Sequence, residues 1–502
     1  MACGIPRLLA TTAAALLGAC TLEPNYHRPL SPVPALDGSG SQGATAAADI
    51  GWKEFFPDPQ LQQLIALALA NNRDLRVAAL NVESAQARYR IQRADLLPTV
   101  DATAVEEVER LPPAVLGSSG AGTGGAGSAG TGGSVLRFYD IGIGFTSYEL
   151  DFFGRLRSLN HAALLQYFSY EETHRSAQLT LVAQVAAAYL AVLADQTLLD
   201  ITRETLKNQD ESYALTQRMF GAGTTTELAL RQAESTVDTA RANLAQYNRQ
   251  LAQDRDVLQL LLGAPIPEGV DISGGLDRGT AVAELEEGIP SDVLVRRPDV
   301  LAAEHLLQSA NAQIGAARAA FLPAITLTGS FGTASTQLSG LFKSDSRAWT
   351  FSPQISVPIF AGGANIANLQ ATKLARETAV AQYEQAIQTA FREVADALAA
   401  RHTLDEQLAA QQALVKASGT AYRLAEMRFR GGVDSYLSTL DAQRTLYGAQ
   451  QQLQNVRVMR LQNLVTLYKA LGGGLLEHGP TGAAAAVTSP AGTARPSPRP
   501  ST

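Results

Sequence analysis

The sequence predicts a mainly helical fold with a smaller β component, built from two internal structural repeats. Two stretches without glycine or proline, 155–220 and 224–262, are 66 and 39 residues long, whereas an ordinary helix has about 11–12 residues. Similar stretches of sequence recur about 209 residues apart. Segments of about ten residues, in which apolar and small polar side chains alternate, separate the helical stretches and have the period of β-strands.

The chain begins with a short apolar stretch that ends at a cysteine. Residues 8–19 are apolar or small, too few to cross a bilayer core of about 30 Å but typical of an export signal over residues 1–19. The tetrapeptide LGAC at 17–20 resembles a bacterial lipobox, in which Cys20 receives a diacylglycerol or palmitate. In such lipoproteins Thr21 favours the outer membrane. An ordinary signal peptide is the alternative.

Composition excludes several classes of function. The net charge is −7 and no basic block occurs, so nucleic acid is not an expected partner. The six histidines lack metal-ligand spacing and there is no Walker A motif. We therefore expect no enzyme activity, no metal and no cofactor other than the covalent lipid at Cys20.

Two pairs of stretches show that one unit is duplicated. The pairs are 88–104 with 313–329, and 214–234 with 423–443. Phe220 and Phe429 are 209 positions apart, whereas Pro98 and Pro323 are 225 apart. The Gly-, Ser- and Ala-rich stretch 117–133 accounts for the difference as a longer loop in the first copy.

An apolar seam follows the second helical stretch with spacings that alternate between four and three. Its members are Ala233, Val237, Ala240, Leu244, Tyr247, Leu251, Asp254, Leu258 and Leu261. The seam recurs 209 residues later, from Ala442 to Ala470, with polar breaks at Arg460 and Asn463. A sustained repeat of about 3.5 residues predicts antiparallel coiled coils.

Residues 176–194 are uncharged and long enough to cross a membrane as a helix. The corresponding stretch 384–402 carries five charged side chains. A duplicated position cannot lie in hydrocarbon in one copy and hold five charges in the other, so we interpret 176–194 as a buried packing face. A membrane helix is the alternative.

Each repeat carries a β-hairpin, at about 99–150 and 324–360. In 324–333 and 349–358, apolar residues alternate with Thr, Ser, Gly and Gln, the pattern of outer-membrane barrel strands. A half-exposed sheet of a soluble domain, which also has a period of two, is the alternative. A span built of strands must be closed in lipid, and barrels start at about eight strands. Several chains must therefore share one barrel, which the long helices would extend into a conduit.

These stretches resemble the outer-membrane factor (TolC-like) family, in particular its lipidated OprM/NodT-type efflux exit ducts. The resemblance covers residues 20–474, and its most specific parts are "ACTLEPNYHRP", "DPQLQQLIALALANNRDLRVA", "LVRRPDVLAAEHLLQSANAQIGAARAAFLPAITLTGSFG", "FSPQISVPIF" and "FREVADALAAR". It implies a homotrimeric α-barrel of long antiparallel coiled-coil helices joined to a shared 12-stranded transmembrane β-barrel. It also implies a lipid-anchored location in the outer membrane, with the helices extending into the periplasm.

The resemblance implies a passive duct from periplasm to exterior, the outer-membrane channel of a tripartite efflux system for drugs, toxic compounds or metal ions. Its partners would be a periplasmic adaptor (membrane fusion) protein and an inner-membrane efflux pump, which open its periplasmic tip. A type I protein-secretion exit duct is one alternative. A periplasmic coiled-coil scaffold lipoprotein without a pore is another, but it would have no use for duplicated amphipathic hairpins.

The resemblance also places a periplasmic gate in "RFRGGVDSYLSTLDAQR" at 428–444. The gate residues would be Asp441, Leu437 and Phe429. Three Asp441 carboxylates around an axis would repel one another and favour cations. Relatives can have Tyr in place of Phe429, and Ser438 stands where the TolC branch has a second Asp, so the acidic ring would be single. Adaptors would contact the hairpin tips at Gly221, Gly223, Gly431 and Gly432.

The expected domain organisation follows from these features. The divisions are a signal peptide (1–19), a lipidated extended N-terminal segment (20–59), repeat 1 (60–264), an equatorial linker (265–297), repeat 2 (298–474) and a disordered tail (475–502).

Overall fold

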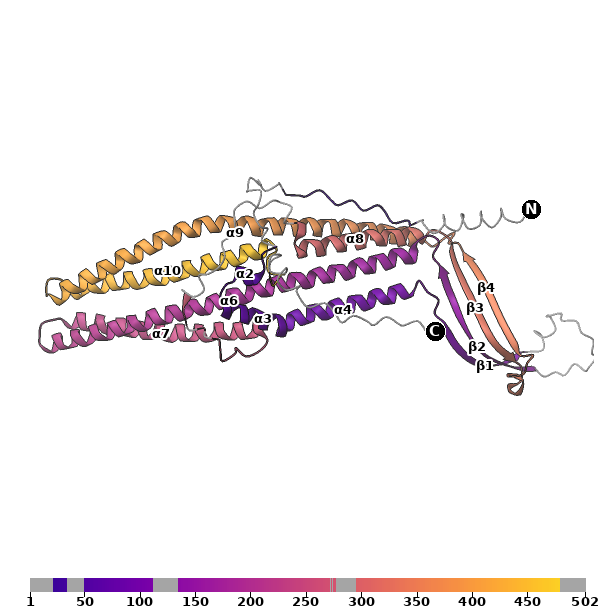
Figure 1. Ribbon diagram of the computed structural model, residues 1–502, viewed down its shortest axis with the longest axis horizontal. Helices are drawn as coiled ribbons and strands as arrows, with labels where there is room; N and C mark the ends of the chain where they lie inside the picture. Colours follow the sequence, from indigo (N-terminus) through magenta and orange to yellow (C-terminus); the bar gives the residue numbers. More distant parts are fainter. Residues whose placement is uncertain are drawn as a thin grey trace, which may run out of the picture. The chain divides into compact units, whose positions relative to one another are not determined.

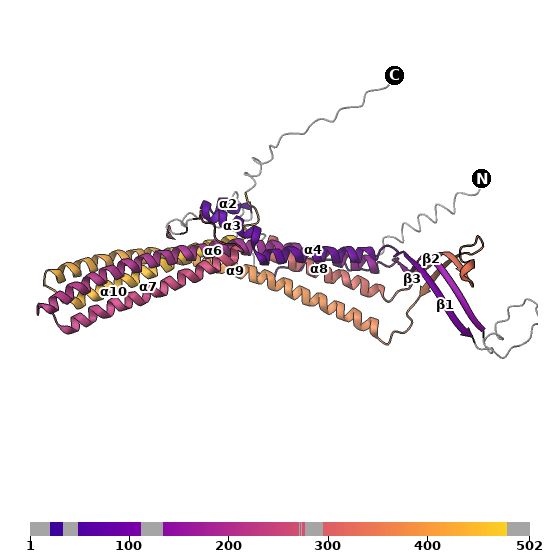
Figure 2. The same cartoon turned by 90° about the horizontal axis from the view of Figure 1, so that it is seen from below.

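The computed structural model describes residues 21–33, 49–111, 134–270, 272, 274–276 and 295–478. In these residues the chain is mainly helical with one antiparallel sheet (Figure 1, Figure 2), as the sequence predicts. The chain divides into two compact units. Unit 1 comprises Met1–Pro29, Glu83–Phe168 and His305–Ala381, and unit 2 comprises Leu30–Val82, Ser169–Glu304 and Gln382–Thr502. The predicted signal peptide, Cys20, most of the linker and the tail from 479 onward lie outside the described residues.

Unit 1 holds the sheet. Its strands are β1 (Asp101–Leu111), β2 (Ser134–Leu150), β3 (Ala324–Ser335) and β4 (Arg347–Ser356). They pair in the order β1-β2-β3-β4, so the hairpin of the first copy lies beside that of the second (Figure 1). Within the described residues, β1 and β4 each have only one neighbour. Their outer edges expose backbone N–H and C=O groups that lipid cannot satisfy.

The two faces of the sheet differ in polarity. Strand register places Ile143, Phe331 and Trp349 in one cross-strand row, and these side chains are 57%, 60% and 74% exposed. The opposite face carries small polar groups, and the hydroxyl oxygens of Ser330 and Thr350 lie 2.7 Å apart. The predicted alternation is confirmed, and an outward apolar band is the usual surface of a membrane barrel.

The strands differ from the prediction in their bounds and at a bulge. β4 begins and ends two residues earlier than the predicted 349–358, and β3 ends two residues later than the predicted 324–333. The β2–β3 register shifts between Phe145 and Tyr148, where Ser147 has a φ of 54° and its N–H donates to Thr328 Oγ1 at 3.2 Å. An extra residue of this kind bends a strand and increases its twist.

Two helices of 67 residues dominate the chain, α6 (Arg155–Gly221) and α9 (Ala364–Arg430). The other long helices are α4 (Arg73–Ala94), α7 (Glu227–Leu262), α8 (Pro298–Ala319) and α10 (Tyr436–Ala470). α6 covers the predicted stretch 155–220, in which no proline removes a backbone donor. α4, α6, α8 and α9 each contribute residues to both units.

Burial along α7 and α10 in unit 2 follows the predicted seam. The buried seam residues of α7 are Ala233, Val237, Ala240, Leu251 and Leu258, and those of α10 are Ala449, Leu453, Val456, Leu467 and Ala470. At the end of α7 the fully buried residue is Leu262 rather than the predicted Leu261. A helix with 3.6 residues per turn drifts against a 3.5-residue repeat, which explains the offset.

The polar breaks in the seam all meet a neighbouring helix. On α10, Arg460 Nε donates to Asp405 Oδ1 of α9, and Asn463 Nδ2 donates to the Ala397 carbonyl at 2.9 Å. On α7, Asp254 lies against Asp195 of α6. The partners of Arg460 and Asn463 offset the cost of placing polar groups in a helical interface.

α6 contains the apolar stretch that we interpret as a packing face. Among the helices of the described residues, only α6 is long and apolar enough to cross a membrane by length and composition, and 56% of its most apolar window is buried. In unit 2 its Val185, Ala186 and Tyr189 are fully buried. Tyr189 Oη also donates to Asp58 Oδ2 at 2.6 Å. This burial favours a packing face.

The segment 20–59, predicted as extended, includes the short helix α2 (Trp52–Phe55) and leads into α3 (Pro59–Asn71). Phe55 stacks on Tyr468 of α10 with ring centroids 3.8 Å apart and planes at 7°. Tyr468 Oη donates to the Ile50 carbonyl at 2.7 Å. Aromatic packing on α10 therefore accounts for a helical turn that the local sequence does not signal.

Arg297 connects three helices within unit 2. It precedes α8, is 5% exposed, and its guanidinium donates to Asp299 Oδ2 at 2.7 Å and to Glu393 Oε2 of α9 at 2.8 Å. Arg297 Nη1 also donates to the carbonyl of Ala470, the last residue of α10, at 3.1 Å. One buried cation thus fixes the start of α8 against α9 and the end of α10.

Candidate gate region and interhelical groove

The two helical hairpins of unit 2 end in turns with the same backbone geometry. Gly223 in the α6–α7 turn and Gly432 in the α9–α10 turn both have a φ of 71°. The N–H of each donates to the carbonyl three residues earlier, and the next N–H donates to the carbonyl five residues earlier, all at 2.9 Å. This is the Schellman pattern, which requires a left-handed residue. The two Schellman turns have their left-handed glycines 209 positions apart, which is the offset of the sequence repeat.

The predicted tip glycines all lie at these turns. Gly221 and Gly223 belong to the first turn, Gly431 and Gly432 to the second, and all four are exposed. A Cβ at Gly223 or Gly432 would meet no atom within 4 Å, so only the backbone conformation requires glycine there. Contact of these tips with an adaptor stays a prediction.

An apolar cluster beside the turns joins the two hairpins. Tyr436 and Leu440 of α10 pack with Ala233 of α7, and Phe429 of α9 is partly buried against them. The rings of Phe429 and Tyr436 have centroids 5.4 Å apart and planes at 60°. The predicted gate residue Phe429 therefore packs between hairpins within one chain, and its role in a gate stays a prediction.

The other two predicted gate residues lie apart from this cluster. Leu437 and Asp441 are one turn apart on α10, which places them on one face of the helix. Leu437 is 57% exposed, and Asp441 is also exposed. Leu437 and Asp441 thus share an exposed face of α10, whereas Phe429 belongs to the apolar cluster.

An ion pair closes the α9–α10 turn, and sequence reasoning missed it. Arg428 Nη2 donates to Asp434 Oδ1 at 3.0 Å, and Nε donates to Oδ2. The hydrogen bond from Arg428 lowers the pKa of Asp434. The signal in the sequence is a pair of opposite charges six residues apart, on either side of two glycines. An exposed pair adds little stability, but this bidentate pair holds both sides of the turn.

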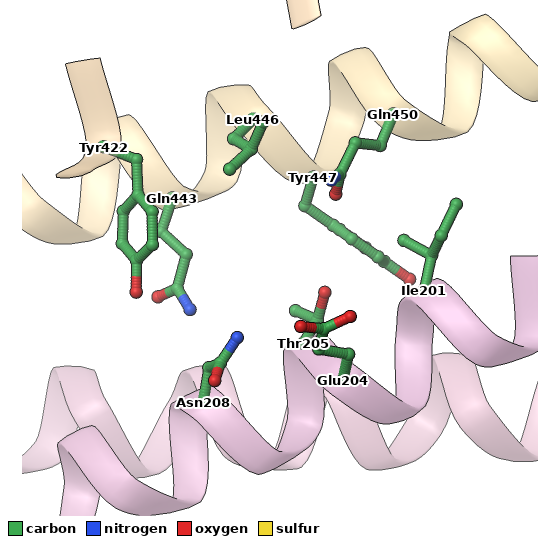
Figure 3. A pocket seen from close by; sticks show the side chains of 9 residues that line it. All are labelled: Ile201, Glu204, Thr205, Asn208, Tyr422, Gln443, Leu446, Tyr447 and Gln450. Atoms are coloured by element: carbon green, nitrogen blue, oxygen red, sulfur yellow. The ribbon is translucent and has the colours of Figure 1, made fainter. Parts of the chain in front are cut away.

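A polar groove lies between α6 and the α9–α10 hairpin in unit 2. In Figure 3, Glu204, Thr205 and Asn208 of α6 face Tyr422 of α9 and residues of α10. The groove has a volume of about 180 Å³, and its other lining residues are Ile201, Gln443, Leu446, Tyr447 and Gln450. A second hollow of about 160 Å³ shares Asn208 and Tyr422 and extends to Phe429. The groove therefore leads to the apolar cluster at the turns.

The chemistry of the groove suits recognition of polar groups. Burial raises the pKa of Tyr422, so its phenol stays a hydrogen-bond donor at neutral pH. In the part of the chain that the structure describes, no three His, Cys, Asp or Glu side chains are placed to hold a metal ion. Carboxylates, amides and phenols can instead bind polar side chains of a peptide. Sequence reasoning missed this groove because its residues come from three helices.

Two carboxyl groups meet in the interface between α6 and α7. Asp195 is 8% exposed, and its Oδ2 has no hydrogen-bond partner among the described residues. Burial, followed by the hydrogen bond and charge of Asp254, raises the pKa of Asp195 from 3.8 to about 7. Nearby, Gln250 Nε2 donates to both carboxylate oxygens of Asp254 at 3.2 Å. A proton between Asp195 and Asp254 supplies the donor that Asp195 otherwise lacks.

The acid pair predicts that this helical unit loses stability as the pH rises. Asp195 is ionised above a pKa of 3.8 when unfolded but keeps its proton to about 7 when folded. Its contribution is therefore fully present below about 4 and is lost as the pH rises through 7. We expect a lower apparent Tm at pH 8 than at pH 5 in detergent. Asp195→Asn should reduce that difference.

Asp200→Asn is the matched control, because Asp200 lies on the same helix, is 58% exposed and pairs with Arg203. It should keep the pH dependence of the wild type. If Asp195→Asn also keeps it, the acid pair does not control stability.

The model of the outer membrane efflux protein family matches residues 64–264 and 289–473. The chain belongs to the outer membrane efflux protein family. The resemblance drawn from the sequence is therefore confirmed, and the matched residues include both helical hairpins and all four strands.

Relatives and a solved structure agree with the family. The toluene efflux pump outer membrane protein TtgC of Pseudomonas putida is 48% identical over 491 residues, which is 96% of this chain and 99% of TtgC. The antibiotic efflux pump outer membrane protein ArpC of Pseudomonas putida has the same identity and coverage. The open state of the Neisseria gonorrhoeae outer membrane channel MtrE has a TM-score of 0.81 at 39% identity, covering 91% of this chain and 99% of MtrE.

The chain is an outer-membrane channel component of an efflux system. The predicted function and outer-membrane location are thereby confirmed, and transport rather than catalysis is the activity of the family. Asp441, Leu437, Phe429 and the tip glycines are placed by the structure, but their roles stay predictions.

Proposed function

We propose that three copies of this efflux protein form one duct, in which three four-stranded sheets close a 12-stranded barrel above a barrel of coiled-coil helices. The observation that carries the proposal is the sheet in unit 1, which among the described residues has two unpaired edges and an exposed apolar face. Such a sheet can span lipid only if other copies pair with its edges. The turns matched at an offset of 209 residues support a duplicated unit.

The duct would be anchored by lipid at Cys20 and opened at the hairpin tips by a periplasmic adaptor and an inner-membrane pump. The exposed turns at Gly223 and Gly432, and the polar groove that leads to them, are suitable surfaces for an adaptor. Around the trimer axis, Leu437 and Asp441 would form an apolar and an acidic ring. Their exposure in a single chain supports this role.

Small organic toxic compounds are the cargo that we propose. Relatives at 48% identity are named for efflux of toluene and of antibiotics, two chemically unrelated classes. A wide duct would discriminate little between them, and the pump would select the cargo. The alternative cargoes are metal ions or the proteins exported by a type I secretion system. A coiled-coil scaffold without a pore is the alternative that would carry no cargo.

Deletion of the gene tests this function in a strain that has no redundant duct. We expect greater sensitivity to several unrelated antibiotics and to toluene, with resistance restored by the wild-type gene. A deletion strain with unchanged resistance to the whole panel would exclude the efflux role. Loss of one secreted protein without a change in resistance would favour the secretion alternative.

The acidic ring predicts cation selectivity at the gate. Asp441→Asn should lower the cation-to-anion permeability ratio by about twofold or more, because charged rings set the selectivity of narrow pores. The reversal potential across a planar bilayer in a KCl gradient measures this ratio. Asp238→Asn is the control, since Asp238 is an exposed aspartate on α7 that pairs with Arg241. Equal reversal potentials for Asp441→Asn and wild type would show that Asp441 does not line the conduction path.

A further inference from the structure

The turn between β3 and β4 lies at the end of the sheet away from the helices. α8 leads into β3 and β4 leads back to α9, so residues 336–346 form the opposite end of this hairpin within unit 1 (Figure 1). A strand of about 9–11 residues crosses the hydrocarbon core of a bilayer, and β3 has 12 residues. If the sheet spans the outer membrane with the helices in the periplasm, the turn lies at the boundary of the outer leaflet.

Hydrogen bonds hold the turn in one conformation. Ser346 Oγ donates to the carbonyls of Leu341 and Lys343 at 2.6 and 2.8 Å, and the Ser346 N–H donates to the Lys343 carbonyl at 3.2 Å. Leu341 and Ser346 are 1% and 7% exposed. The N–H of Ala334 in β3 donates to the Ser346 carbonyl at 2.8 Å. The turn is therefore a folded extension of the sheet with a small buried centre of its own.

Two large apolar side chains of the turn are exposed. Leu338 is 63% exposed and Phe342 is 78% exposed, although their neighbour Leu341 is buried. Exposure of such side chains to water is unfavourable, whereas aromatic side chains at the ends of barrel strands usually lie at the interface between lipid and water. The turn thus presents an apolar surface at the place where the outer leaflet begins.

Two cations accompany this apolar surface. Lys343 lies in the turn, Arg347 is the first residue of β4, and both are exposed. The hydrogen bond from the Ser346 N–H to the Lys343 carbonyl closes a turn whose ends are usually within about 7 Å, so Lys343 lies close to Arg347. Arg347 shares its face of β4 with Trp349, because successive side chains alternate. Neither cation has an ion-pair partner among the described residues.

The charges of this hairpin are confined to its outer end. Residues 319–372 contain only three charged side chains, Lys343, Asp345 and Arg347. At the end of the hairpin next to the helices, residues 348–363 carry no charge. The apolar face of the hairpin therefore meets basic groups at one membrane boundary only, and these groups exceed the single acid beside them.

Basic groups beside an apolar surface match the chemistry of a phosphorylated lipid. Ammonium and guanidinium groups form charge-assisted hydrogen bonds to phosphate oxygens, and anionic lipids attract basic residues at a membrane surface. The long stem of Arg347 lets its guanidinium reach the headgroups while the strand lies among acyl chains.

We propose that the β3–β4 turn is a binding site for the phosphorylated glycolipid of the outer leaflet. Leu338 and Phe342 contact its acyl region, and Lys343 and Arg347 bind its phosphates. The site thereby fixes the depth of this end of the barrel in the membrane. This inference rests on the proposed barrel, because only a sheet that spans the membrane places the turn in that leaflet.

Binding of lipid A, the phosphorylated glycolipid of lipopolysaccharide, to the purified full-length protein in detergent tests the site. We expect diphosphorylated lipid A to bind at least about tenfold more tightly than lipid A without phosphates, because each basic residue near an anionic lipid surface contributes roughly fivefold in affinity. Lys343→Gln/Arg347→Gln should remove most of this preference. Arg88→Gln/Lys373→Gln is the control, because it removes the same charges from exposed positions of α4 and α9 in unit 1.

Further variants separate the two halves of the site. Leu338→Ser/Phe342→Ser should weaken binding of both forms of lipid A by a similar factor and leave the preference for phosphate unchanged. Asp345→Asn should increase the preference, because it removes the charge that opposes phosphate. An unchanged mass of the complex in detergent shows that a variant has folded. If the double cation variant does not fold, Lys343→Gln alone, outside both strands, should still lower the preference.

The outcomes distinguish the site from the barrel. A wild-type preference in Lys343→Gln/Arg347→Gln, or in Lys343→Gln if the double variant does not fold, would overturn the phosphate site. Equal affinity of the wild type for phosphatidylglycerol and lipid A would overturn the assignment to the outer leaflet. Unchanged affinities in Leu338→Ser/Phe342→Ser would overturn the acyl contact. A single chain in detergent contradicts the barrel, whereas the affinity comparison still decides whether the turn binds lipid phosphate.

Discussion

Replacing Arg297 by alanine is expected to lower the free energy of unfolding by about 3–5 kcal/mol, the usual cost of removing one partner from a buried ion pair. Arg297 is 5% exposed and bonds to Asp299, Glu393 and the carbonyl of Ala470. Burial alone would lower the pKa of Arg297, but the bonds to Asp299 and Glu393 raise it above its ordinary value. The guanidinium is therefore charged, and its removal takes a charged donor away from two carboxylates and from the end of a helix.

The apparent Tm of the purified protein measures this effect. Arg296→Ala is a matched control, because Arg296 is the neighbouring residue and is exposed. It should change the Tm little. Arg297→Lys should fall between wild type and Arg297→Ala, because an ammonium keeps the charge but cannot reproduce the planar fork of a guanidinium. Equal melting temperatures for Arg296→Ala and Arg297→Ala would contradict the role of Arg297 in joining three helices.

Phe331→Arg is expected to destabilise the protein in the membrane by about 2–4 kcal/mol, the cost of an arginine at the lipid face of a barrel near the bilayer centre. Phe331 is 60% exposed and lies in the row with Ile143 and Trp349. The residue before it, Ser330, points to the opposite face and contacts Thr350. Ser330→Arg should be tolerated, because the lumen of a barrel is polar.

Heat resistance of the oligomer in SDS compares the two variants, since only an assembled barrel resists the detergent. Loss of the resistant band in Phe331→Arg, with retention in Ser330→Arg, would show that the apolar face contacts lipid. The reverse result would mean that the apolar face is turned inward, and equal behaviour would mean that the sheet does not lie in a membrane.

The helices and the sheet faces could be predicted because their signals are periodic. The seam from Ala233 to Leu258 repeats every 3.5 residues over six turns or more, and alternation in 324–333 has a period of two. The bulge at Ser147 and the helix α2 could not be predicted in this way. The first depends on pairing with Thr328, and the second on packing of Phe55 against Tyr468, more than 400 positions away.

The candidate site was predicted in part. The resemblance supplied Asp441 and Leu437, which the structure places on one exposed face of α10. It also supplied Phe429, which the structure places in an apolar cluster with Tyr436. The groove of Figure 3 was not predicted, because Glu204 and Tyr422 come together only through packing of α6 against the second hairpin. Residues joined by tertiary packing leave no local pattern in a single sequence.

If the sheet spans lipid, copies of this chain must combine their sheets into one closed pore. The most direct test is the mass of the purified full-length protein in detergent, together with its conductance in a planar bilayer. We predict a complex of three chains that passes ions in discrete steps of uniform size. A single chain that leaves the bilayer insulating would contradict the shared barrel.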